Sequence, residues 1–464
     1  QGELEDVSRL DDVTARPYCV QYCESDFAFL SRLLEEEGIA YHFEHGDDEC
    51  VMVLTDFDGG RIDRSGEAPC GPKILGREVF GFRASGRLQP RSVHLDDYNW
   101  RKPNLELNAI SRSGVTDFTD MVYPGRYEET VAQGKTLATV REERADSERR
   151  RAQARTHCRL LTAGTIFTLD HPVAKFSGTY LVTALQSRAI QHEFAGDEGA
   201  PPYEAVLEVV PCGKGASRAP SRFRPRHGTP RPRIYGSQTA RVTADPSDPN
   251  AEINVGGPND LGCVRLKFHW DMDGGRHAQE PTSRWVRVSQ FFAGADHGAL
   301  WHPRVGDEVI VEFIDGDPDR PIVTGRVYNG TKPAPENATQ RPTYSAIKSN
   351  TSPHNGNYNL IAFEDLQGSE QIIIHAARDW VTNVERNCSR GVGVDEDVHI
   401  KGDQQYIVDG SQRKTVGVER SMIAGTSITN SAPKIVNMAG DTFTAIAGVN
   451  LYCTGGSMGV RSAP

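Results

Sequence analysis

The 464-residue sequence predicts a mainly β protein with an α+β N-terminal part, a small closed barrel in the middle and a C-terminal intertwined β-helix. Three observations predict this order. A capped helix and several strands fall in the first 220 residues, five short strands with polar turns follow up to residue 330, and glycines recur about every eight residues after residue 390. At roughly 150 residues per domain, the length agrees with three such parts.

The N-terminal part opens with a helix and a hairpin. Ser25 can cap a helix over 26–37, in which apolar residues recur at three- and four-residue spacing, and Gly38 fits its end. The apolar runs 39–43 and 51–54 predict two strands joined by an acidic hairpin loop.

A second, charged helix is predicted over about 128–160, because Glu and Arg recur there at i,i+3 and i,i+4 spacing. Its Arg149-Arg150-Arg151 run is interpreted as a solvated helix face rather than a nucleic-acid patch, because acidic residues interleave. Strands are expected at 165–169, 180–185 and 203–210.

A Gly/Ser/Pro/Arg-rich stretch over 213–232 lacks apolar periodicity and predicts a linker. Its arginines favour a solvated linker, with contact to phosphates or to an acidic partner surface as the alternative. These arginines are Arg218, Arg222, Arg224 and Arg226.

The next hundred residues predict a five-stranded Greek-key barrel of the OB type. Its five strands are expected at 239–242, 262–270, 285–288, 308–313 and 322–328. Some OB barrels bind nucleic acid through aromatic residues and a basic groove. The turns here are acidic at Asp315, Asp317 and Asp319, so we expect no nucleic-acid partner.

The last part carries a near-octad repeat of short β-rich stretches and glycines, which is typical of a β-helix or solenoid. We expect the glycines to permit tight corners with positive φ. Because a lone ribbon of short strands leaves its edges unpaired, several copies should intertwine. The turn glycines are Gly393, Gly402, Gly410, Gly417, Gly425, Gly440 and Gly448.

Charge and cysteine content exclude several classes of protein. The net charge is -11, and residues 1–60 alone carry sixteen Asp/Glu against three Arg, so the acidity belongs to one end. This distribution argues against a chain-wide surface for nucleic acid or anionic membrane. The nine scattered cysteines form no CxxC pair and are expected to be free thiols. No run is long and apolar enough for a transmembrane helix, and no secretory signal is visible.

No catalytic or metal-binding constellation stands out. Gly455-Gly456-Ser457-Met458-Gly459 matches GxSxG, but no acid or His follows it, as a hydrolase of that type requires. His192-Glu193 does not complete HExxH, and Asp271-Met272-Asp273-Gly274 does not complete a calcium loop. The sequence therefore predicts no enzyme, no cofactor and no metal, although pairs of carboxylates for glycoside hydrolysis are too numerous to single out.

Four segments carry long, ordered motifs: YCVQYCESDF and RLLEEEGI within 18–39, SRWVRVSQ at 283–290, PRVGDEVIVEF and GDPDRP within 303–321, and KSNT and FED within 348–365. Together they resemble the VgrG family, the spike proteins of bacterial type VI secretion. Cys23, Leu360 and Ala362 depart from the residues that are usual in that family.

The resemblance implies a homotrimer similar to the hub-and-spike complex of contractile phage tails, with an intertwined trimeric β-helix. Its parts would be a hub-type domain over 1–222, incomplete at its N-terminal side, an OB neck over 233–331, a connector over 332–389 and a needle over 390–464. The spike would cap a tube of Hcp rings, carry a PAAR-repeat tip protein, contact baseplate components and deliver effector cargo by mechanical puncture of a target membrane.

Such a protein would assemble in the bacterial cytoplasm and then be secreted or injected without a Sec signal. Two alternatives stay open at this point. One is a peptidoglycan hydrolase or toxin carried on the same spike, and the other is a hub or spike protein of a phage tail.

Overall fold

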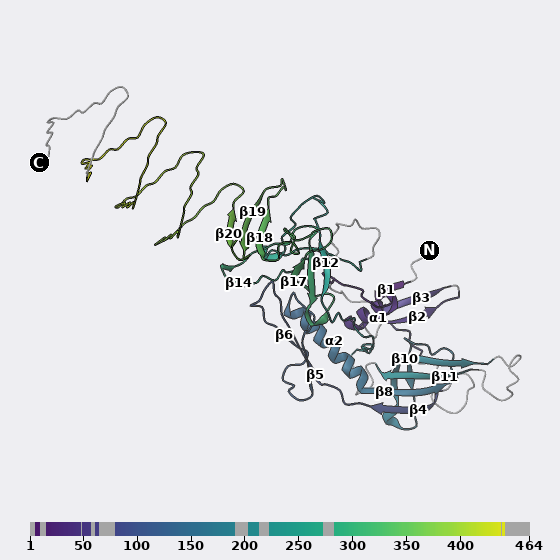
Figure 1. The fold of residues 1–464 in the computed structure, drawn as a ribbon. Helices are drawn as coiled ribbons and strands as arrows, with labels where there is room; N and C mark the ends of the chain where they lie inside the picture. Colours follow the sequence, from purple (N-terminus) through teal and green to yellow (C-terminus); the bar gives the residue numbers. More distant parts are fainter. Residues whose placement is uncertain are drawn as a thin grey trace. The chain divides into compact units, whose positions relative to one another are not determined.

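The structure, a computed structural model, divides into two compact units, Gln1–Trp380 and Val381–Pro464. It describes residues 15–47, 49–56, 61–64, 79–190, 203–212, 222–271, 283–437 and 439–440, together with the backbone of 5–9. Each unit is described by itself below (Figure 1).

The first unit holds the two α-helices of the described chain and all of its strands. In chain order these are β1 Glu5–Arg9, α1 Asp26–Glu37, β2 Ala40–His45, β3 Cys50–Thr55, β4 Val79–Gly86, β5 Ser92–Asp97, β6 Leu107–Ile110, β7 Thr119–Val122, α2 Val131–Arg149, β8 Arg150–Thr156, β9 Ile166–Leu169, β10 Gly178–Ala189, β11 Tyr203–Pro211, β12 Gln238–Val242, β13 Leu266–Phe268, β14 Ala293–Gly294, β15 His297–Gly298, β16 Glu308–Phe313, β17 Pro321–Val327, β18 Tyr344–Asn350, β19 Tyr358–Glu364 and β20 Gln371–His375.

Helix α1 confirms the predicted bounds and both of its caps. The Ser25 side chain accepts a hydrogen bond from the Ala28 amide at 3.2 Å, and Gly38 ends the helix in the left-handed region at φ 76°. The predicted hairpin is also present, because β2 and β3 pair antiparallel, and β1 adds to β3 in parallel.

The second helix is shorter than predicted, since α2 ends at Arg149 and the chain continues directly as β8. Ala152, Ala154 and Thr156 alternate with exposed residues and are buried. β8 lies between β4 and β11 in a five-stranded sheet of order β4-β8-β11-β10-β9. Pairing on both edges overrides the helical charge pattern that the sequence carries through this segment.

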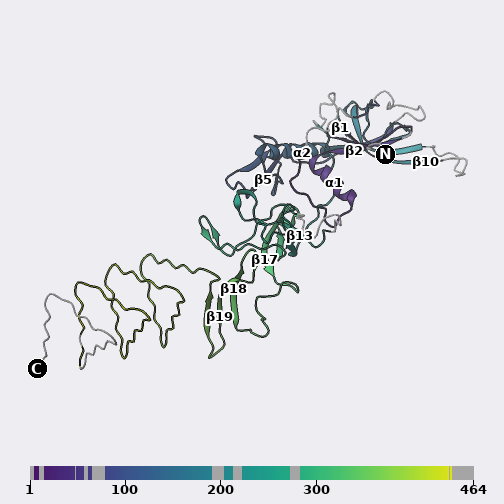
Figure 2. The same ribbon diagram turned by 90° about the horizontal axis from the view of Figure 1, so that it is seen from above.

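Helix α2 covers a second, three-stranded sheet of order β6-β5-β7 (Figures 1 and 2). Tyr127 lies between them, almost fully buried, and its hydroxyl donates to the carbonyls of Leu95 and Leu107. Burial raises the pKa of Tyr127 to about 12. This residue therefore satisfies its polar end inside an otherwise apolar core.

The predicted OB barrel is present between residues 238 and 327. Four of its strands form a sheet of order β13-β12-β16-β17. The remaining predicted strand, 285–288, makes two single bridges instead, Val286 to Val264 on one side and Val288 to Val323 on the other. These bridges close the sheet, and a core of small aliphatic residues with Phe268 and Phe313 fills it.

The predicted connector contains an antiparallel meander of β18, β19 and β20. Ala362 in its central strand is fully buried, whereas Ile347, Ile361 and Ile374 lie opposite one another in register and are exposed. The meander therefore presents an apolar row that no described segment of its own chain covers.

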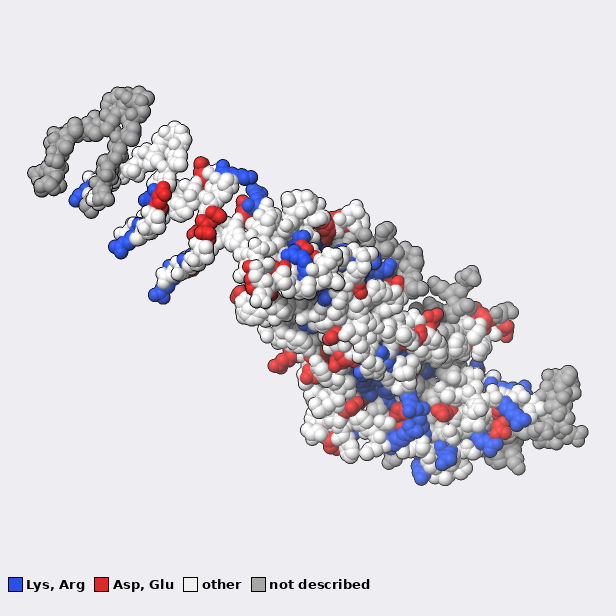
Figure 3. Space-filling model, in the orientation of Figure 1, with Lys and Arg blue, Asp and Glu red and all other residues white. Residues whose placement is uncertain are grey.

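Among the described residues, no helix has the length and apolar content that crossing a bilayer requires. Acidic and basic residues are interspersed on the face seen in Figure 3.

Candidate functional site

The described part of the second unit is a coil whose corners recur with a fixed period of eight residues, and the same period already begins at the end of the first unit. Between residues 377 and 426, seven two-residue bends begin at 377, 385, 393, 401, 409, 417 and 425. The predicted turn glycines occupy the first or the second position of these bends, which explains their unequal spacing. Gly440 also lies in a bend, whereas Gly448 is outside the described residues.

From residue 384 onward an aliphatic residue or alanine precedes each corner, so the eight-residue period places these residues at equivalent positions of successive turns. We call this column the octad ladder, and its side chains are 44 to 51% exposed. Its members are Val384, Val392, Ile400, Val408 and Val416, and alanines continue the spacing at Ala424 and Ala432.

The opposite side of the coil is more open to solvent. Ile407 and Ile423, which lie at odd-numbered positions of the straight segments, are 78% and 94% exposed. Gln404 donates to the Tyr406 hydroxyl at 2.7 Å, and both lie at even-numbered positions, as the ladder residues do. The ladder is thus a partly apolar column that no described segment of the same chain covers.

The coil has no backbone pairing of its own in the part that the structure describes, 381–437 and 439–440, although its segments are extended. Unpaired extended segments present rows of backbone donors and acceptors that readily accept another chain. An open coil with an apolar ladder therefore has the features that intertwining with further copies would satisfy.

The expectation of positive φ at the turn glycines is wrong for those that the structure describes. None of them, from Gly393 to Gly440, lies in the left-handed region, and a Cβ atom added at any of them would meet no atom within 4 Å in this chain. The corners are wide enough to turn with ordinary backbone angles, so glycine is not required there by the chain's own geometry.

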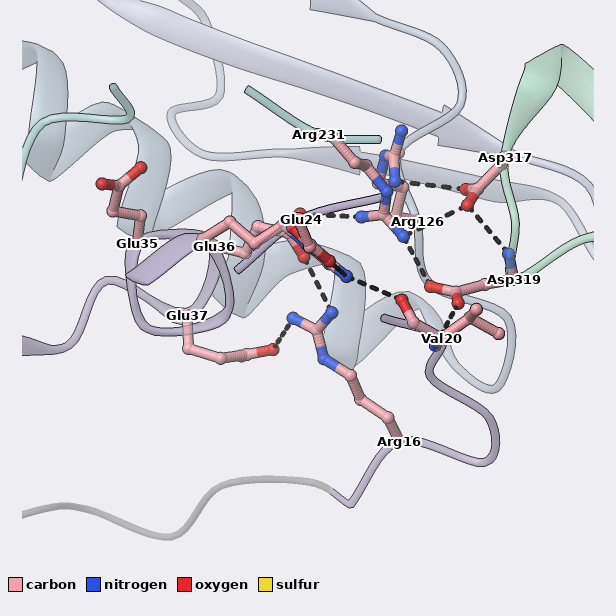
Figure 4. A network of polar contacts seen from close by, with 12 residues as sticks. Arg16, Val20, Glu24, Glu35, Glu36, Glu37, Arg126, Arg231, Asp317 and Asp319 are labelled. Carbon is pink, nitrogen blue, oxygen red and sulfur yellow. Dashed lines mark hydrogen bonds and ion pairs between the residues drawn. The ribbon is translucent and has the colours of Figure 1, made fainter. Parts of the chain in front are cut away.

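A second site is an ionic network between the N-terminal part and the barrel, here called the arginine seam (Figure 4). Arg231 bridges Glu36 of α1 at 2.7 Å and Asp319 of the β16–β17 turn at 2.6 Å. Arg126 contacts Asp317 of the same turn at 3.1 Å. The network joins segments that are far apart in sequence and anchors the barrel to α1.

Further contacts extend the arginine seam on both sides. Arg16 contacts Glu36 at 2.7 Å, and the Val20 amide donates to Asp319 at 2.8 Å. Arg320 contacts the buried Asp97 at 2.7 Å. Because bidentate and shared guanidinium contacts hold several carboxylates at once, the barrel's orientation on the N-terminal part is tightly specified.

Burial and neighbouring charges oppose each other in the arginine seam. Burial raises the pKa of Glu36, but Arg231 and Arg16 outweigh it and hold that pKa below its ordinary value. Burial and the neighbouring Asp317 raise the pKa of Asp319, which Arg231 only partly offsets. The seam therefore holds carboxylates that ionise at different pH values.

The prediction of a solvated linker is wrong for part of the described segment that begins at residue 222. Phe223 and Arg224 are buried, and Arg224 contacts Glu143 of α2 at 2.8 Å and the Gly38 carbonyl at 3.1 Å. Low apolar content hid this packing, because here an arginine rather than an aliphatic residue fills the buried position. Arg226 is exposed as predicted, Arg222 is half-buried and lies 3.7 Å from Asp56, and Arg218 lies outside the described residues.

The acidic N-terminal end is also less free than its charge indicates. Glu24 contacts the buried Arg32 at 2.7 Å, and the Glu35 carboxylate accepts hydrogen bonds from the Gly228 and Thr229 amides. The same holds in the barrel, where Asp317 of the acidic β16–β17 turn is buried beside Arg126 and Arg231. Much of the acidity serves internal pairing.

The weak catalytic motifs find no support in the described residues. Ser457, His192 and most of the calcium-like segment lie outside them, and no cluster of His, Cys, Asp and Glu with metal-binding geometry occurs in the described ranges. Of the described cysteines, Cys19, Cys23, Cys50, Cys263 and Cys388 are free thiols, as predicted.

Sequence reasoning found the repeat but missed its most regular element. The spacing of eight between Val384, Val392 and Ile400 is present in the sequence, but the unequal spacing of the neighbouring glycines obscures it. The arginine seam had no such signal, because its members are spread from residue 16 to residue 320.

Comparison with protein families agrees with this architecture part by part. Residues 4–193 match the phage tail baseplate hub (GPD), and residues 253–328 match the type VI secretion system/phage-baseplate injector OB domain. Residues 345–439 match the C-terminal trimerisation domain of bacteriophage T4 gp5. The last match covers the meander and the described octads.

Comparison with individual proteins decides the family. The spike protein VgrG1a of Pseudomonas aeruginosa is 34% identical, and the match covers 97% of this chain and 73% of that protein. The chain belongs to the VgrG family of type VI secretion spike proteins. VgrG1c of the same organism is 36% identical over 82% of this chain, which spans about half (52%) of that relative's length. A more distant VgrG relative, the actin cross-linking toxin VgrG1 of Vibrio cholerae, is 29% identical over 89% of this chain and 38% of the toxin.

Proposed function

We propose that this chain forms a homotrimeric puncturing spike at the tip of a type VI secretion tail tube. The observation that carries the proposal is the octad ladder, an apolar column on a coil without internal backbone pairing, within a segment that matches a trimerisation domain. Three copies wound around one axis would cover the ladder and pair the free backbone edges.

The mechanical role follows from how such a shaft carries load. Each backbone hydrogen bond contributes only about 0.5–1.5 kcal/mol net, so no single bond resists puncture. In an intertwined shaft the bonds of adjacent segments are loaded together, and no chain can leave without breaking its pairs with two others. Rigidity would thus arise from cooperativity along the repeat.

The proposed division of labour is a hub over 1–222, a neck over 233–331, a connector over 332–389 and a needle over 390–464. The octad corners begin at residue 377, so part of the connector would already belong to the shaft. The arginine seam would hold the hub and the neck in one orientation while axial force passes through them.

The proposed partners are an Hcp tube ring at the hub end, a PAAR-repeat tip protein at the needle end, baseplate components and effector cargo. The spike would assemble in the bacterial cytoplasm and leave the cell through the contracting tail rather than through a Sec signal. The membrane would be punctured mechanically, without a membrane-spanning helix.

The test is the mass of the purified complex, measured by native mass spectrometry and by light scattering after size exclusion. We expect three times 51.1 kDa and, in electron micrographs, a head with a thin shaft. A stable monomer at micromolar concentration would overturn the proposal.

A second candidate function rests on the match to the actin cross-linking toxin, which shows that a chain of this kind also occurs within a toxin. Assays of actin cross-linking and of cell-wall turnover with the purified chain test for a spike-borne toxin or peptidoglycan hydrolase. We expect no activity in either assay. The remaining alternative, a spike of a phage tail, would be indicated by phage tail genes in the genomic neighbourhood.

A further inference from the structure

The barrel carries a short hairpin with large apolar side chains that its own chain leaves in solvent. Strands β14 and β15 form this arm, which spans 291–301 and lies at the edge of the barrel region (Figure 1). Phe291 and Leu300 are 85% and 70% exposed, and Phe292 and Trp301 are also exposed. No other turn of the described barrel gathers so many exposed large apolar residues within so few positions.

The arm is held in one conformation at its base. The Gln290 side chain pairs with the backbone of Trp301 in both directions, accepting from the amide at 3.1 Å and donating to the carbonyl at 3.3 Å. The Arg326 guanidinium donates to the same carbonyl. Higher up, the Ala299 amide donates to the Phe292 carbonyl at 2.8 Å.

A fixed arm with an apolar surface has the features of a docking element, because it presents that surface without having to change its conformation. Scattered apolar residues on a surface need no explanation, but a group of four on an ordered projection marks an interaction site. Because the base is pinned by three side-chain hydrogen bonds, the arm reaches its partner with little loss of conformational entropy.

The position of the barrel relative to the trimerising segment indicates which partner covers the arm. Arg304 of the barrel donates to the Asn350 carbonyl at 2.6 Å. Glu252 accepts from the Ser352 hydroxyl at 2.9 Å and from the His354 amide at 2.8 Å. These contacts clamp the barrel to the first hairpin of the segment 345–439, which matches the trimerisation domain.

When three copies wind together over 345–439, this clamp brings three barrels side by side around the same axis. The connecting residues 328–343 span at most about 55 Å even when fully extended, so each barrel stays within that reach of the shared axis, and the Arg304 and Glu252 contacts hold it against the hairpin. Neighbouring barrels therefore meet at high effective concentration. A contact made by the arm would then extend, into the barrel region, the interface between copies that is proposed for residues 345–439.

We propose that the β14–β15 arm docks through Phe291 and Leu300 onto the barrel of a neighbouring copy of this chain. The inference rests on the proposed trimer and adds an interface in the neck that the trimerisation segment does not include. The arm would couple the three barrels laterally, so that axial load on one neck is shared by all three.

The test places a photoreactive benzoylphenylalanine at Phe291 in the full chain, with the same substitution at Leu88 as the matched control. Leu88 is equally exposed but lies in the N-terminal part. After irradiation of the purified protein, we expect cross-links from position 291 to barrel residues of a second chain, seen as a two-chain band and mapped by mass spectrometry. Position 88 should give no cross-links to the barrel.

A companion variant, Phe291→Ser with Leu300→Ser, should remain trimeric through its repeat while barrel amides exchange at least tenfold faster with deuterium. Cross-links confined to one chain or to another domain, in a protein that is trimeric by mass, would overturn the docking inference alone. A monomeric mass would instead overturn the proposed function, so the two failures are distinguishable.

Discussion

The two units of the chain differ in where their groups find partners. In the first unit, aliphatic cores fill the sheets and the barrel, and buried arginines such as Arg32 and Arg224 are matched by carboxylates or carbonyls of the same chain. In the second, every described residue from 381 onward is exposed, and no backbone group takes part in a strand pair.

This difference teaches that one sequence can encode one part stabilised by contacts within the chain and another part stabilised by association with other copies. The sheets and the barrel of the first unit bury cores of their own, so their stability rests mainly on contacts within the chain. The described part of the second unit has no core and no strand pair of its own, so we expect its stability to come from association and to depend on protein concentration. A substitution in the first unit should therefore change unfolding, whereas one in the second should change assembly.

The largest effect is expected from Ile400→Asp in the octad ladder. In the trimer this places three carboxylates in the covered core of the shaft, which costs several kcal/mol per chain, and we expect no trimer at micromolar concentration. The matched control is Ile407→Asp, the same change on the open side of the coil. Native mass spectrometry of both variants measures the fraction of chains that is trimeric. Equal trimer content would show that the ladder does not face the other copies.

The next effect is expected from Arg224→Ala in the first unit. Removing this buried guanidinium leaves Glu143 without its partner and should lower the free energy of unfolding by about 3 kcal/mol. The exposed Arg226→Ala serves as the control. We expect urea titrations to show the loss while the mass of the complex stays unchanged. If Arg224→Ala instead dissociated the complex, the separation between a part stabilised within the chain and a part stabilised by association would be wrong.

A pair of glycine substitutions compares the two units directly. Gly38 has φ 76°, and a Cβ atom there would lie 2.5 Å from Val140 Cγ1, so Gly38→Ala should cost about 2 kcal/mol. Gly410 has neither constraint, so Gly410→Ala should change stability by less than about 1 kcal/mol. Thermal melting measures both. A large loss at Gly410 would indicate that another copy packs directly against this corner.

The smallest effect concerns pH and the arginine seam. The pKa of Glu36 is depressed in the folded state, so its contribution to stability is present above its ordinary pKa of 4.5 and is lost as pH falls through the folded value. Glu36→Gln should therefore cost about 1 kcal/mol at pH 7 and progressively less below pH 4.5.

Asp319 works in the opposite direction. Its pKa is raised, so the cost of ionising it in the folded state is relieved on acidification. Urea unfolding at pH 7 and pH 4 measures the net effect, with the exposed Glu106→Gln as the control. A loss in Glu36→Gln that is the same at both pH values would show that the Glu36 charge does not contribute.

The local elements were predictable where their signals are local. Helix α1 was predicted with its exact caps because Ser25 and Gly38 act through the backbone beside them. The end of α2 was not, because β8 exists only when β4 and β11 flank it. The predicted barrel strand 285–288 forms only two single bridges, because it meets its partners Val264 and Val323 only when the barrel closes.

The sequence by itself determined the family, the OB barrel and the eight-residue repeat, because these depend on periodicity and on contiguous motifs. Only the tertiary structure decided that part of the supposed linker is packed, that several described carboxylates of the N-terminal part are paired within the chain and that the described turn glycines have ordinary backbone angles. The physical reason is that Arg231 pairs with both Glu36 and Asp319, which lie 283 positions apart in the sequence. Contacts between residues so far apart leave no periodic pattern in the sequence.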